Sequence, residues 1–383
     1  MKRTHLNICL FTIALILLCS LQMNAQKIKV TNNSQFQRTD EIVQISLYQV
    51  PDLDKKNIKK LGVVSAVDRK RLTTQLVDNK LDGSYDFLLF QDSFKPKETK
   101  EYELKYFDSP GQSDSKAFVT FVEGREDIAW ENDRVAFRMY GPALAAEVNN
   151  GIDVWSKSVK YLIVHKWYDE EEKGISSYHQ DKGEGADFFS VGTSLGCGGS
   201  ALMKNDILYQ SGVFTSYKII ANGPLRVQFE LTYADFSAAG EKVTETKTVI
   251  LDAGSNLNKI RTSFNLVPAD VDFTAGLVKR ANISVYTDYQ NSIISLWGDN
   301  TSKKEDGLVG TAVILPAKGN QKIIEDKQHV LIVNERITDM DQAYYAGTCW
   351  NKSGDFKTNE EWIKYLTEFA AKLKSPLQVE INK

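Results

Sequence analysis

Short runs in which apolar and polar residues alternate recur along the whole chain. A period of two predicts strands that have one buried face and one exposed face. Gly, Asn, Asp and Pro clusters separate many of the runs, as in large antiparallel β proteins. The predicted strands include IVQISLY (42–48), AFVTFV (117–122), VKYLIVHK (159–166), LRVQFELTY (225–233), KVTETKTVIL (242–251), KIRTSFNLV (259–267) and HVLIVN (329–334).

One segment near the C-terminus has helical periodicity instead. In TNEEWIKYLTEFAAKLKSP (358–376) a capping box formed by Thr358 and Glu361 precedes the apolar stripe, and Pro376 follows it. The spacing of three or four residues places one stripe on a single helix face: Trp362, Leu366, Phe369 and Leu373. The pattern therefore predicts an all-β protein that ends with one helix.

The polar, turn-rich stretch FDSPGQSDS (107–115) predicts a domain boundary. We expect a signal peptide over residues 1–25, a small N-terminal β region over 26–110, and a main β domain over 111–383. The main domain is predicted to be a large antiparallel β-sandwich closed by the C-terminal helix. No internal repeat of fixed period interrupts this organisation.

The first 25 residues have the pattern of an export signal. Lys2 and Arg3 precede a long apolar run, and the small residue Ala25 follows it. Cleavage near Ala25 would release the chain into the periplasm, with no membrane span in the mature protein. A lipoprotein attached through Cys19 is the weaker alternative, because Leu18 stands where a small residue is expected.

Composition narrows the possible partners. The net charge of −3 and the absence of a basic tract argue against nucleic-acid binding, which needs a positive surface. After signal removal only Cys197 and Cys349 remain, so a disulfide framework is excluded. These two cysteines could form a single disulfide bridge or remain as two buried thiols. The sequence carries no signal for an oligomeric state.

The segment WENDRVAFRMYGP (130–142) offers the first candidate site. Read as one strand, it places five residues with binding chemistry on one face: Trp130, Asn132, Arg134, Arg138 and Tyr140. Guanidinium groups bind carboxylate or sulfate in a bidentate manner, and flat aromatic rings can pack on sugar rings. The alternative is that both arginines are surface residues paired with neighbouring acids.

A second strand, LRVQFELTY, repeats this arrangement. Its polar face carries Arg226, Gln228 and Glu230, while its apolar residues form the other face. Two such strands predict a concave, anion-binding sheet surface, with Arg134, Arg138 and Arg226 facing one groove.

The segment SSYHQDKGEGADFFSVGTSLGCGG (176–199) offers a third candidate. It contains Tyr178, His179, Glu184 and Asp187 among several glycines. A phosphate-binding loop is excluded, because no Lys-Ser/Thr ending or helix signal follows. The spacing of the acids also differs from that of a calcium loop. A mobile loop at a catalytic rim remains, and a simply solvated loop is the alternative.

Histidine usage points to the same loop. His329 opens an apolar strand and is expected to be structural, whereas His165 ends a predicted strand and could be either a structural or a catalytic histidine. His179 is the expected proton-transfer residue, because imidazole titrates near neutral pH. A zinc site of His165 and His179 lacks a recognisable spacing and a third ligand. We therefore expect no metal and no cofactor.

Four separated motifs, WENDRVAFRMYGP, GIDVW, YHQDKGEGADFFSVGTSLGCGG and GPLRVQFELTY, resemble the domain-of-unknown-function family 4861 (DUF4861). The resemblance implies a secreted bacterial protein of a polysaccharide-utilisation system. It further implies a supersandwich fold similar to that of galactose mutarotases and several polysaccharide lyases, and an anionic, uronate-containing oligosaccharide as substrate. Fold analogy does not fix the reaction.

Elimination from a uronate requires neutralisation of the carboxylate, a base and an acid. The expected catalytic residues are His179, Tyr178 and Tyr140. The expected substrate-binding residues are Trp130, Asn132, Arg134, Arg138, Arg226, Glu230 and Asp187. The same set serves a lyase or a dehydratase. The alternatives are a glycoside hydrolase that uses two of Glu184, Asp187 and Glu230, an epimerase or mutarotase, and a non-catalytic sugar-binding protein.

Overall fold

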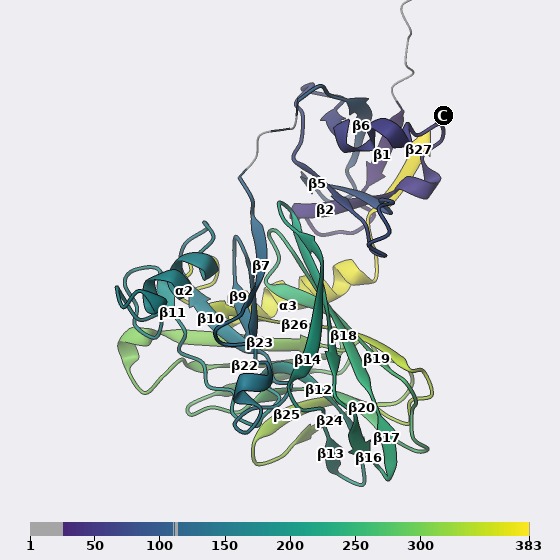
Figure 1. The fold of residues 1–383 in the computed structure, drawn as a ribbon. Helices are drawn as coiled ribbons and strands as arrows, with labels where there is room; N and C mark the ends of the chain where they lie inside the picture. Colours follow the sequence, from purple (N-terminus) through teal and green to yellow (C-terminus); the bar gives the residue numbers. More distant parts are fainter. Residues whose placement is uncertain (1–25, 110, 112–113, 383) are drawn as a thin grey trace, which may run out of the picture.

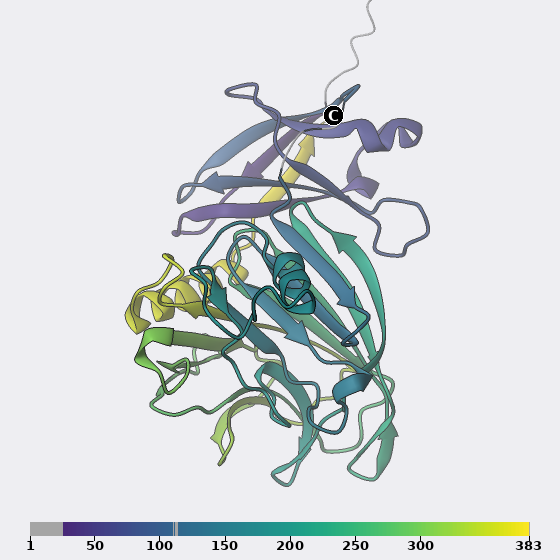
Figure 2. The same ribbon diagram turned by 60° about the vertical axis from the view of Figure 1, so that its left-hand side comes forward.

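A computed structural model describes residues 26–109, 111 and 114–382, which fold into a small N-terminal sandwich and a large β domain (Figures 1 and 2). Antiparallel sheets dominate, which confirms the predicted all-β fold with a C-terminal helix. The predicted signal peptide and Cys19 lie outside the described residues. Among the described residues, no helix is long and apolar enough to cross a membrane.

The N-terminal sandwich consists of two facing sheets. One contains, in spatial order, β27 (Gln378–Asn382), β1 (Lys27–Thr31), β6 (Thr99–Tyr106) and β3 (Leu61–Ser65). The other contains β2 (Arg38–Ser46), β5 (Phe87–Phe94) and β4 (Thr74–Val77), and the short 3₁₀ helices η1 (Leu47–Gln49) and η2 (Lys55–Lys60) connect strands. Alternating residues such as Val43, Ile45 and Phe90 are buried between the sheets.

The last strand of the chain belongs to this sandwich. Strand β27 pairs antiparallel with β1, from Gln378 opposite Thr31 to Asn382 opposite Lys27. The sequence analysis places these residues in the main domain. The alternating pattern of a single strand reveals which side chains are buried but not which distant strand it joins.

The main domain is built around an eight-stranded antiparallel sheet. Its strands, in spatial order, are β14 (Phe214–Asn222), β15 (Arg226–Tyr233), β18 (Glu245–Asp252), β19 (Leu257–Phe264), β26 (Asp341–Trp350), β23 (Leu308–Ile314), β22 (Ile293–Asp299) and β21 (Ser284–Asp288). A five-stranded sheet contains β13 (Ile207–Tyr209), β12 (Cys197–Lys204), β20 (Asp272–Val278), β25 (His329–Asn334) and β24 (Gln321–Glu325).

A third sheet of the main domain carries most of the candidate residues. Its strands are β11 (Gly185–Ala186), β10 (Asp153–Lys157), β9 (Ala136–Met139), β8 (Asp127–Asn132) and β7 (Ala117–Val122), and a separate hairpin joins β16 (Phe236–Ala238) to β17 (Glu241–Val243). The three sheets share one apolar core. Trp130 of the third sheet contacts Phe229 of β15 there, with ring centroids 4.9 Å apart.

The predicted C-terminal helix is confirmed as α3 (Asn359–Leu373). The Thr358 hydroxyl accepts a hydrogen bond from the backbone N–H of Glu361, which caps the first turn. Trp362 and Leu366 are fully buried against β22 and β23. In Figure 1 this helix lies beside the large sheet and leads into β27.

A second helix replaces one predicted strand. The segment VKYLIVHK was predicted as a strand, but α2 (Val164–Glu172) begins within it. The buried Glu131 carboxylate accepts the backbone N–H groups of Ile163 and Val164, both at 2.7 Å, and so holds the start of the helix. His165 consequently lies exposed on the helix and not at a strand end. Two 3₁₀ helices, η3 (Pro142–Leu144) and η4 (Lys304–Asp306), complete the elements.

Candidate active site

The segment WENDRVAFRMYGP forms the β8–β9 hairpin and not one strand. The Asn132 side chain accepts hydrogen bonds from the backbone N–H groups of Arg134 and Val135, at 2.8 and 3.0 Å. These bonds stabilise a turn in which the chain reverses direction. Trp130 then pairs with Phe137 in the core, and Arg138 pairs with Ala129 on the opposite face. The predicted face that Trp130 shares with Arg138 is therefore wrong, because a turn resets the alternation.

Trp130 and Asn132 are part of the interior. The Trp130 indole N–H donates to Asn258 at 2.7 Å, and the Asn132 amide donates to the carbonyls of Asp252 and Ser255. Neither residue is exposed. Their side chains hold the third sheet against the large sheet.

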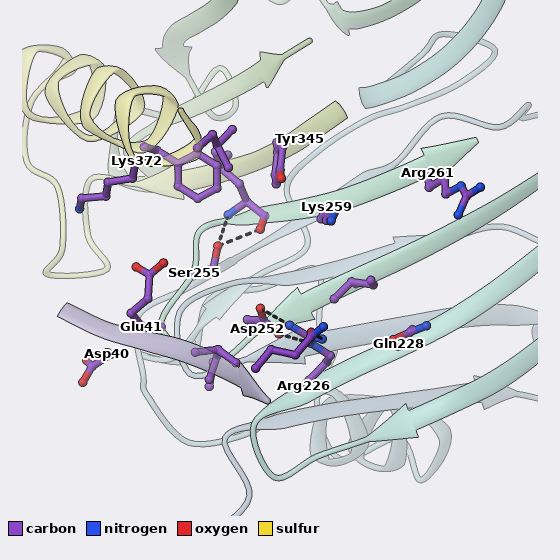
Figure 3. Close-up of a pocket in the computed structure, with 18 of the residues that line it drawn as sticks. Asp40, Glu41, Arg226, Gln228, Asp252, Ser255, Lys259, Arg261, Tyr345 and Lys372 are labelled. Carbon is purple, nitrogen blue, oxygen red and sulfur yellow. Dashed lines mark hydrogen bonds and ion pairs between the residues drawn. The ribbon is translucent and has the colours of Figure 1, made fainter. Parts of the chain in front are cut away.

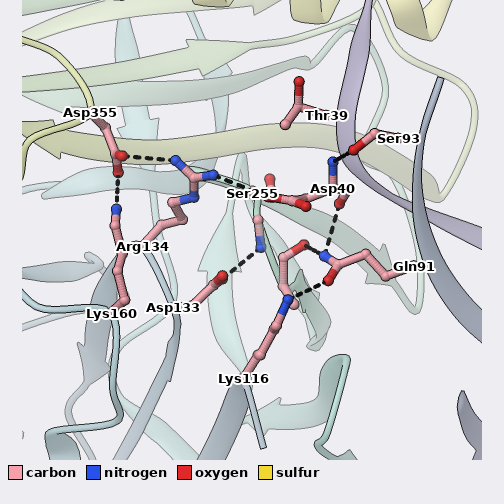
Figure 4. A network of polar contacts seen from close by, with 12 residues as sticks. Thr39, Asp40, Gln91, Ser93, Lys116, Asp133, Arg134, Lys160, Ser255 and Asp355 are labelled. Carbon is pink, nitrogen blue, oxygen red and sulfur yellow. Dashed lines mark hydrogen bonds and ion pairs between the residues drawn. The ribbon is translucent and has the colours of Figure 1, made fainter. Parts of the chain in front are cut away.

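Arg134 lies in a polar network between the two domains (Figure 4). Its guanidinium contacts Asp355, which precedes α3, at 2.8 Å, and Asp40 of the N-terminal sandwich at 3.5 Å. Lys160 approaches the same Asp355 carboxylate at 2.6 Å. Arg134 is therefore paired with neighbouring acids, as the alternative interpretation of the sequence predicted.

Arg226 and Glu230 lie on the outer face of the large sheet, where they line a groove beside the N-terminal sandwich. Arg226 binds Asp252 with two nitrogens, at 2.5 and 2.9 Å. Arg138 lies in the third sheet under α2, so the three arginines do not face one groove. That predicted arrangement is wrong.

Arg138 is instead the centre of a buried polar cluster. It lies directly opposite Asp153 on β10 and contacts that carboxylate at 2.7 Å. The same guanidinium nitrogen donates to Asp187 at 2.7 Å and to the Tyr140 hydroxyl at 2.8 Å. A second nitrogen donates to the Tyr178 hydroxyl at 3.2 Å. The structure thus brings together four of the predicted site residues around one guanidinium.

His179 completes this cluster at the surface. Its Nδ1 lies 3.5 Å from the Asp187 carboxylate, and its side chain is 54% exposed, whereas that of Asp187 is 2% exposed. The Asp187 backbone N–H donates to the Tyr178 carbonyl at 2.8 Å, which ties the two segments together. The imidazole also lies against the Tyr178 ring, with centroids 4.4 Å apart. The nearest hydrogen-bond partner of Nδ1 is the Asp187 backbone carbonyl at 3.3 Å, so both the backbone and the side chain of Asp187 lie against the accessible imidazole.

The aromatic surroundings of the cluster come from β10 and α2. Tyr178 stacks on Trp155 with ring centroids 5.1 Å apart, and Tyr168 meets Tyr178 edge to face. Trp167 stacks on the other side of Trp155 at 5.5 Å. The apolar face of α2 thus covers the Arg138 cluster and shields it from water.

His179 and Asp187 form one wall of a surface hollow of about 550 Å³. The opposite wall includes Thr301, Lys303 and Lys352 from the loops that follow β22 and β26. An Asn300 side chain donates to Ser156 of β10 at 2.7 Å, which fixes that wall beside the cluster. Both lysines and the acids Asp181, Glu305 and Asp306 therefore line the same hollow as the histidine.

Burial shifts the protonation of the cluster. It raises the pKa of Asp187 well above the usual range, and the neighbouring Asp153 charge adds to this effect. Burial also raises the pKa of Asp153, of Tyr140 and of Tyr178. Burial would lower the pKa of Arg138, but Asp153 and Asp187 outweigh it and raise that pKa.

The hydrogen-bond pattern agrees with protonated acids in this cluster. The Oδ2 atoms of Asp153 and Asp187 accept from Arg138, while both Oδ1 atoms are buried without a hydrogen-bond partner among the described residues. Two facing carboxyl groups beside one cation favour retention of a proton. Both tyrosines also keep their protons at neutral pH, so they can donate but not accept one.

Sequence reasoning missed two members of the cluster, Asp153 and Asp127. Asp127 lies 3.9 Å from Arg138 and is 1% exposed. Each acid is the first residue of a short strand, directly before apolar residues, in DIAWEN and DVWSK. An acid directly before such residues is the signal that could have identified them, because a buried carboxyl needs a partner.

The glycine-rich segment is a packed part of the site. Gly185 has a φ of +110°, and an added Cβ would lie 1.9 Å from the Ser156 carbonyl oxygen. It forms β11 against β10, so the glycine permits this close approach. Glu184 beside it accepts from Lys166 at 2.6 Å and from the Trp167 indole at 3.0 Å. The expected mobile loop is therefore anchored on both sides of His179.

The described residues contain no cluster of three or more His, Cys, Asp or Glu side chains arranged to hold a metal ion. Cys197 and Cys349 are both buried and unpaired, which settles the alternative that the sequence left open. His329 is buried, and its Nε2 accepts from the Leu195 backbone N–H at 3.2 Å, in keeping with a structural role.

A family model described as "Domain of unknown function (DUF4861)" matches residues 30–379, nearly the whole chain. The chain belongs to this family. The resemblance found in the four motifs is thus confirmed. This chain is also similar to "Uncharacterized protein P7" of Formosa agariphila. The two are 34% identical over 375 residues, which cover 93% of each chain.

Two solved structures align with the chain at low identity. A glycosyl hydrolase family 38 protein from Enterococcus faecalis aligns with 95% of this DUF4861 chain, at a TM-score of 0.53 and 10% identity. An alpha-mannosidase from Enterococcus faecalis V583 aligns with 95% of the chain, at a TM-score of 0.48 and 8% identity. The chain spans about half the length of each, 48% and 46%. The first similarity shows the fold alone.

Proposed function

We propose that this DUF4861 protein is an exported carbohydrate-active enzyme that eliminates a group from a uronate-containing oligosaccharide. The observation that carries the proposal is the pairing of an exposed His179 imidazole with the buried Asp187 carboxyl, 3.5 Å apart, at a surface hollow. An imidazole held by an acid is suited to proton transfer near neutral pH. The similarity to a glycosyl hydrolase fold supports a sugar ligand as an analogy.

The reaction needs a base, an acid and a cation. His179 would remove the proton beside the uronate carboxylate. Neither Tyr178 nor Tyr140 lines the hollow and both are buried, so a water molecule in the hollow would supply the proton to the departing oxygen. Lys303 and Lys352, which line the hollow, would neutralise the carboxylate as negative charge develops.

The geometry supports hydrolysis less well. Hydrolysis needs two carboxyl groups that flank the scissile bond. Glu184 is held by Lys166 and Trp167, and Glu230 lies on the large sheet in another groove. Neither is paired with Asp187 in the way that the hydrolase alternative requires.

Replacement of His179 by Gln tests the proposal. The variant should lose about 10²–10⁴-fold in rate, the usual contribution of a general base, while it remains folded. His165→Gln is the matched control, because His165 is an exposed histidine on α2. Defined uronate oligosaccharides would be incubated with each protein and analysed by mass spectrometry and by the ultraviolet absorbance of the conjugated, unsaturated uronate.

The products separate the reactions. A product that has lost one water indicates a dehydratase, and two fragments of which one is unsaturated indicate a lyase. Elimination would be contradicted if the wild-type protein formed only saturated products. Such products are fragments that have gained water, or isomers of unchanged mass. Equal turnover by the His179 variant and its control would remove His179 from the mechanism.

A further inference from the structure

A groove away from His179 lies between the large sheet, the N-terminal sandwich and α3 (Figure 3). Its volume is about 660 Å³. The floor is the outer face of four neighbouring strands, β15, β18, β19 and β26. Strand β2 and helix α3 form its sides.

The floor is a regular grid of side chains. Strand register places Gln228, Ile250, Lys259 and Tyr345 in one row across the four strands. Adjacent strands lie about 4.8 Å apart, so such a row extends over roughly 15 Å. A parallel row two residues away contains Glu230, Thr248 and Arg261.

The sides of the groove are fixed to its floor. Arg226 binds Asp252 and also donates to Gln44 of β2 at 2.7 Å. Arg38 of β2 donates to the carbonyls of Lys372 and Ser375 at the end of α3, at 3.1 and 2.5 Å. The groove is thus built before any ligand arrives, which reduces the entropic cost of binding.

Most of the charged groups in the groove are paired, and two are not: among the described residues, Glu230 on β15 and Lys259 on β19 make no ion pair. Asp40, Glu41 and Asp252 each pair with an arginine. Among the described residues, no acid lies within ion-pair distance of the Lys259 ammonium, and Lys259 is exposed. Tyr345 stands beside it in the row, with its ring held edge to face on Phe369 at 5.3 Å. A free cation therefore adjoins a fixed aromatic ring.

We infer that this groove is a second carbohydrate-binding site, which binds a stretch of anionic oligosaccharide through Lys259 and Tyr345. The amide of Gln228 and the hydroxyl of Thr248 offer hydrogen bonds to sugar hydroxyls, and the Tyr345 ring offers an apolar face. A peptide cannot add a strand to the floor, because all four floor strands are paired on both edges. Only the class of ligand rests on the proposed function.

The experiment measures binding by isothermal titration calorimetry in the full chain with His179→Gln, which keeps turnover from consuming the ligand. The probes are uronate hexasaccharides of several linkages, with cellohexaose as the neutral probe. Lys259→Met should weaken binding of at least one uronate probe tenfold or more, and Lys259→Arg should restore most of it. Lys55→Met is the control, because Lys55 is exposed and does not line the groove.

A second measurement locates the ligand. Lysine acetylation followed by mass spectrometry should show that a uronate probe protects Lys259 and leaves Lys55 reactive. The inference is overturned if no uronate probe binds, if Lys259→Met and Lys55→Met bind all probes equally, or if cellohexaose binds as tightly as the uronates. Binding is measured without turnover, so the two proposals can fail separately. If the wild-type protein catalyses no elimination, the proposed function is overturned, but binding of the uronate probes to the groove still stands.

Discussion

The buried acids around Arg138 make the stability of the protein depend on pH. Burial raises the pKa of Asp127 from 3.8 to about 6, although Arg138 and Arg125 oppose this effect. A carboxyl whose pKa is raised by folding stabilises the fold below its unfolded pKa, and this contribution is lost as pH rises through the folded value. The difference corresponds to about 2 kcal/mol between pH 4 and pH 7, because the unfolded carboxyl is already partly ionised at pH 4.

Asp127→Asn should therefore remove one source of that loss. Between pH 4 and pH 7 the free energy of unfolding of the wild type should fall by about 2 kcal/mol more than that of the variant. Urea denaturation at both pH values measures this difference. Asp169→Asn serves as the control, because Asp169 is a partly exposed residue paired with Lys173 on α2. An identical fall in Asp127→Asn and wild type would show that Asp127 does not gain a proton on folding.

At the scale of elements, α2 depends on one buried ion pair. Lys157 donates to Glu131 at 2.7 Å, and both side chains are completely buried. The other Glu131 oxygen accepts hydrogen bonds from the start of α2. The apolar side chains of α2 in turn pack over Tyr178. The pair therefore links the third sheet to the helix that shapes the candidate active site.

Removal of one partner should be far more damaging than removal of both. Lys157→Met leaves a buried carboxylate unpaired and should cost about 3–5 kcal/mol in the free energy of unfolding. The double variant Glu131→Gln, Lys157→Met should recover much of that loss, because a neutral amide can still accept from the start of α2. Chemical denaturation measures stability, and near-ultraviolet circular dichroism reports the aromatic packing. Equal losses in the single and double variants would contradict the role of the pair.

The strands and α3 could be predicted because local periodicity determines them. Strand β15 and helix α3 bury the predicted faces, including Val227, Phe229, Trp362 and Leu366. The β8–β9 turn was missed because Asn132 also fits the alternation of a strand, so a reversal there leaves no break in the pattern. Helix α2 was missed for a related reason, since its start is held by Glu131, 32 residues earlier in the chain.

The candidate site shows the same division between local and distant contacts. His179 and Asp187 were selected because they share one short segment, and the structure places them 3.5 Å apart. Arg138 and Arg226 were grouped because their strands look alike, but strand pairing puts them in different sheets. Residue chemistry can be read locally, whereas the grouping of residues depends on which strands become neighbours.

At the scale of the whole molecule, the C-terminal strand connects the two domains. Helix α3 packs on the large sheet, and β27 then continues into the N-terminal sandwich beside β1. Leu377, Val379 and Ile381 pack on the core of that sandwich. Figure 1 shows the last, yellow strand among the purple strands of the N-terminus. The N-terminal sandwich is thus completed by the other end of the chain.

A chain truncated after Ser375 should lose stability in the N-terminal sandwich first. Three partly buried aliphatic side chains contribute on the order of 1 kcal/mol each, so the sandwich should lose about 3 kcal/mol. Strand β1 would also gain an unpaired edge. Hydrogen exchange followed by mass spectrometry should show faster exchange over residues 26–106 and little change in β18, β19 and β26. Glu380→Gln is the matched control, since the exposed Glu380 side chain makes surface contacts with Lys29 and Gln378 and none with the core. Faster exchange throughout the main domain would mean that the domains unfold as one unit, and unchanged exchange in the sandwich would show that β27 does not stabilise it.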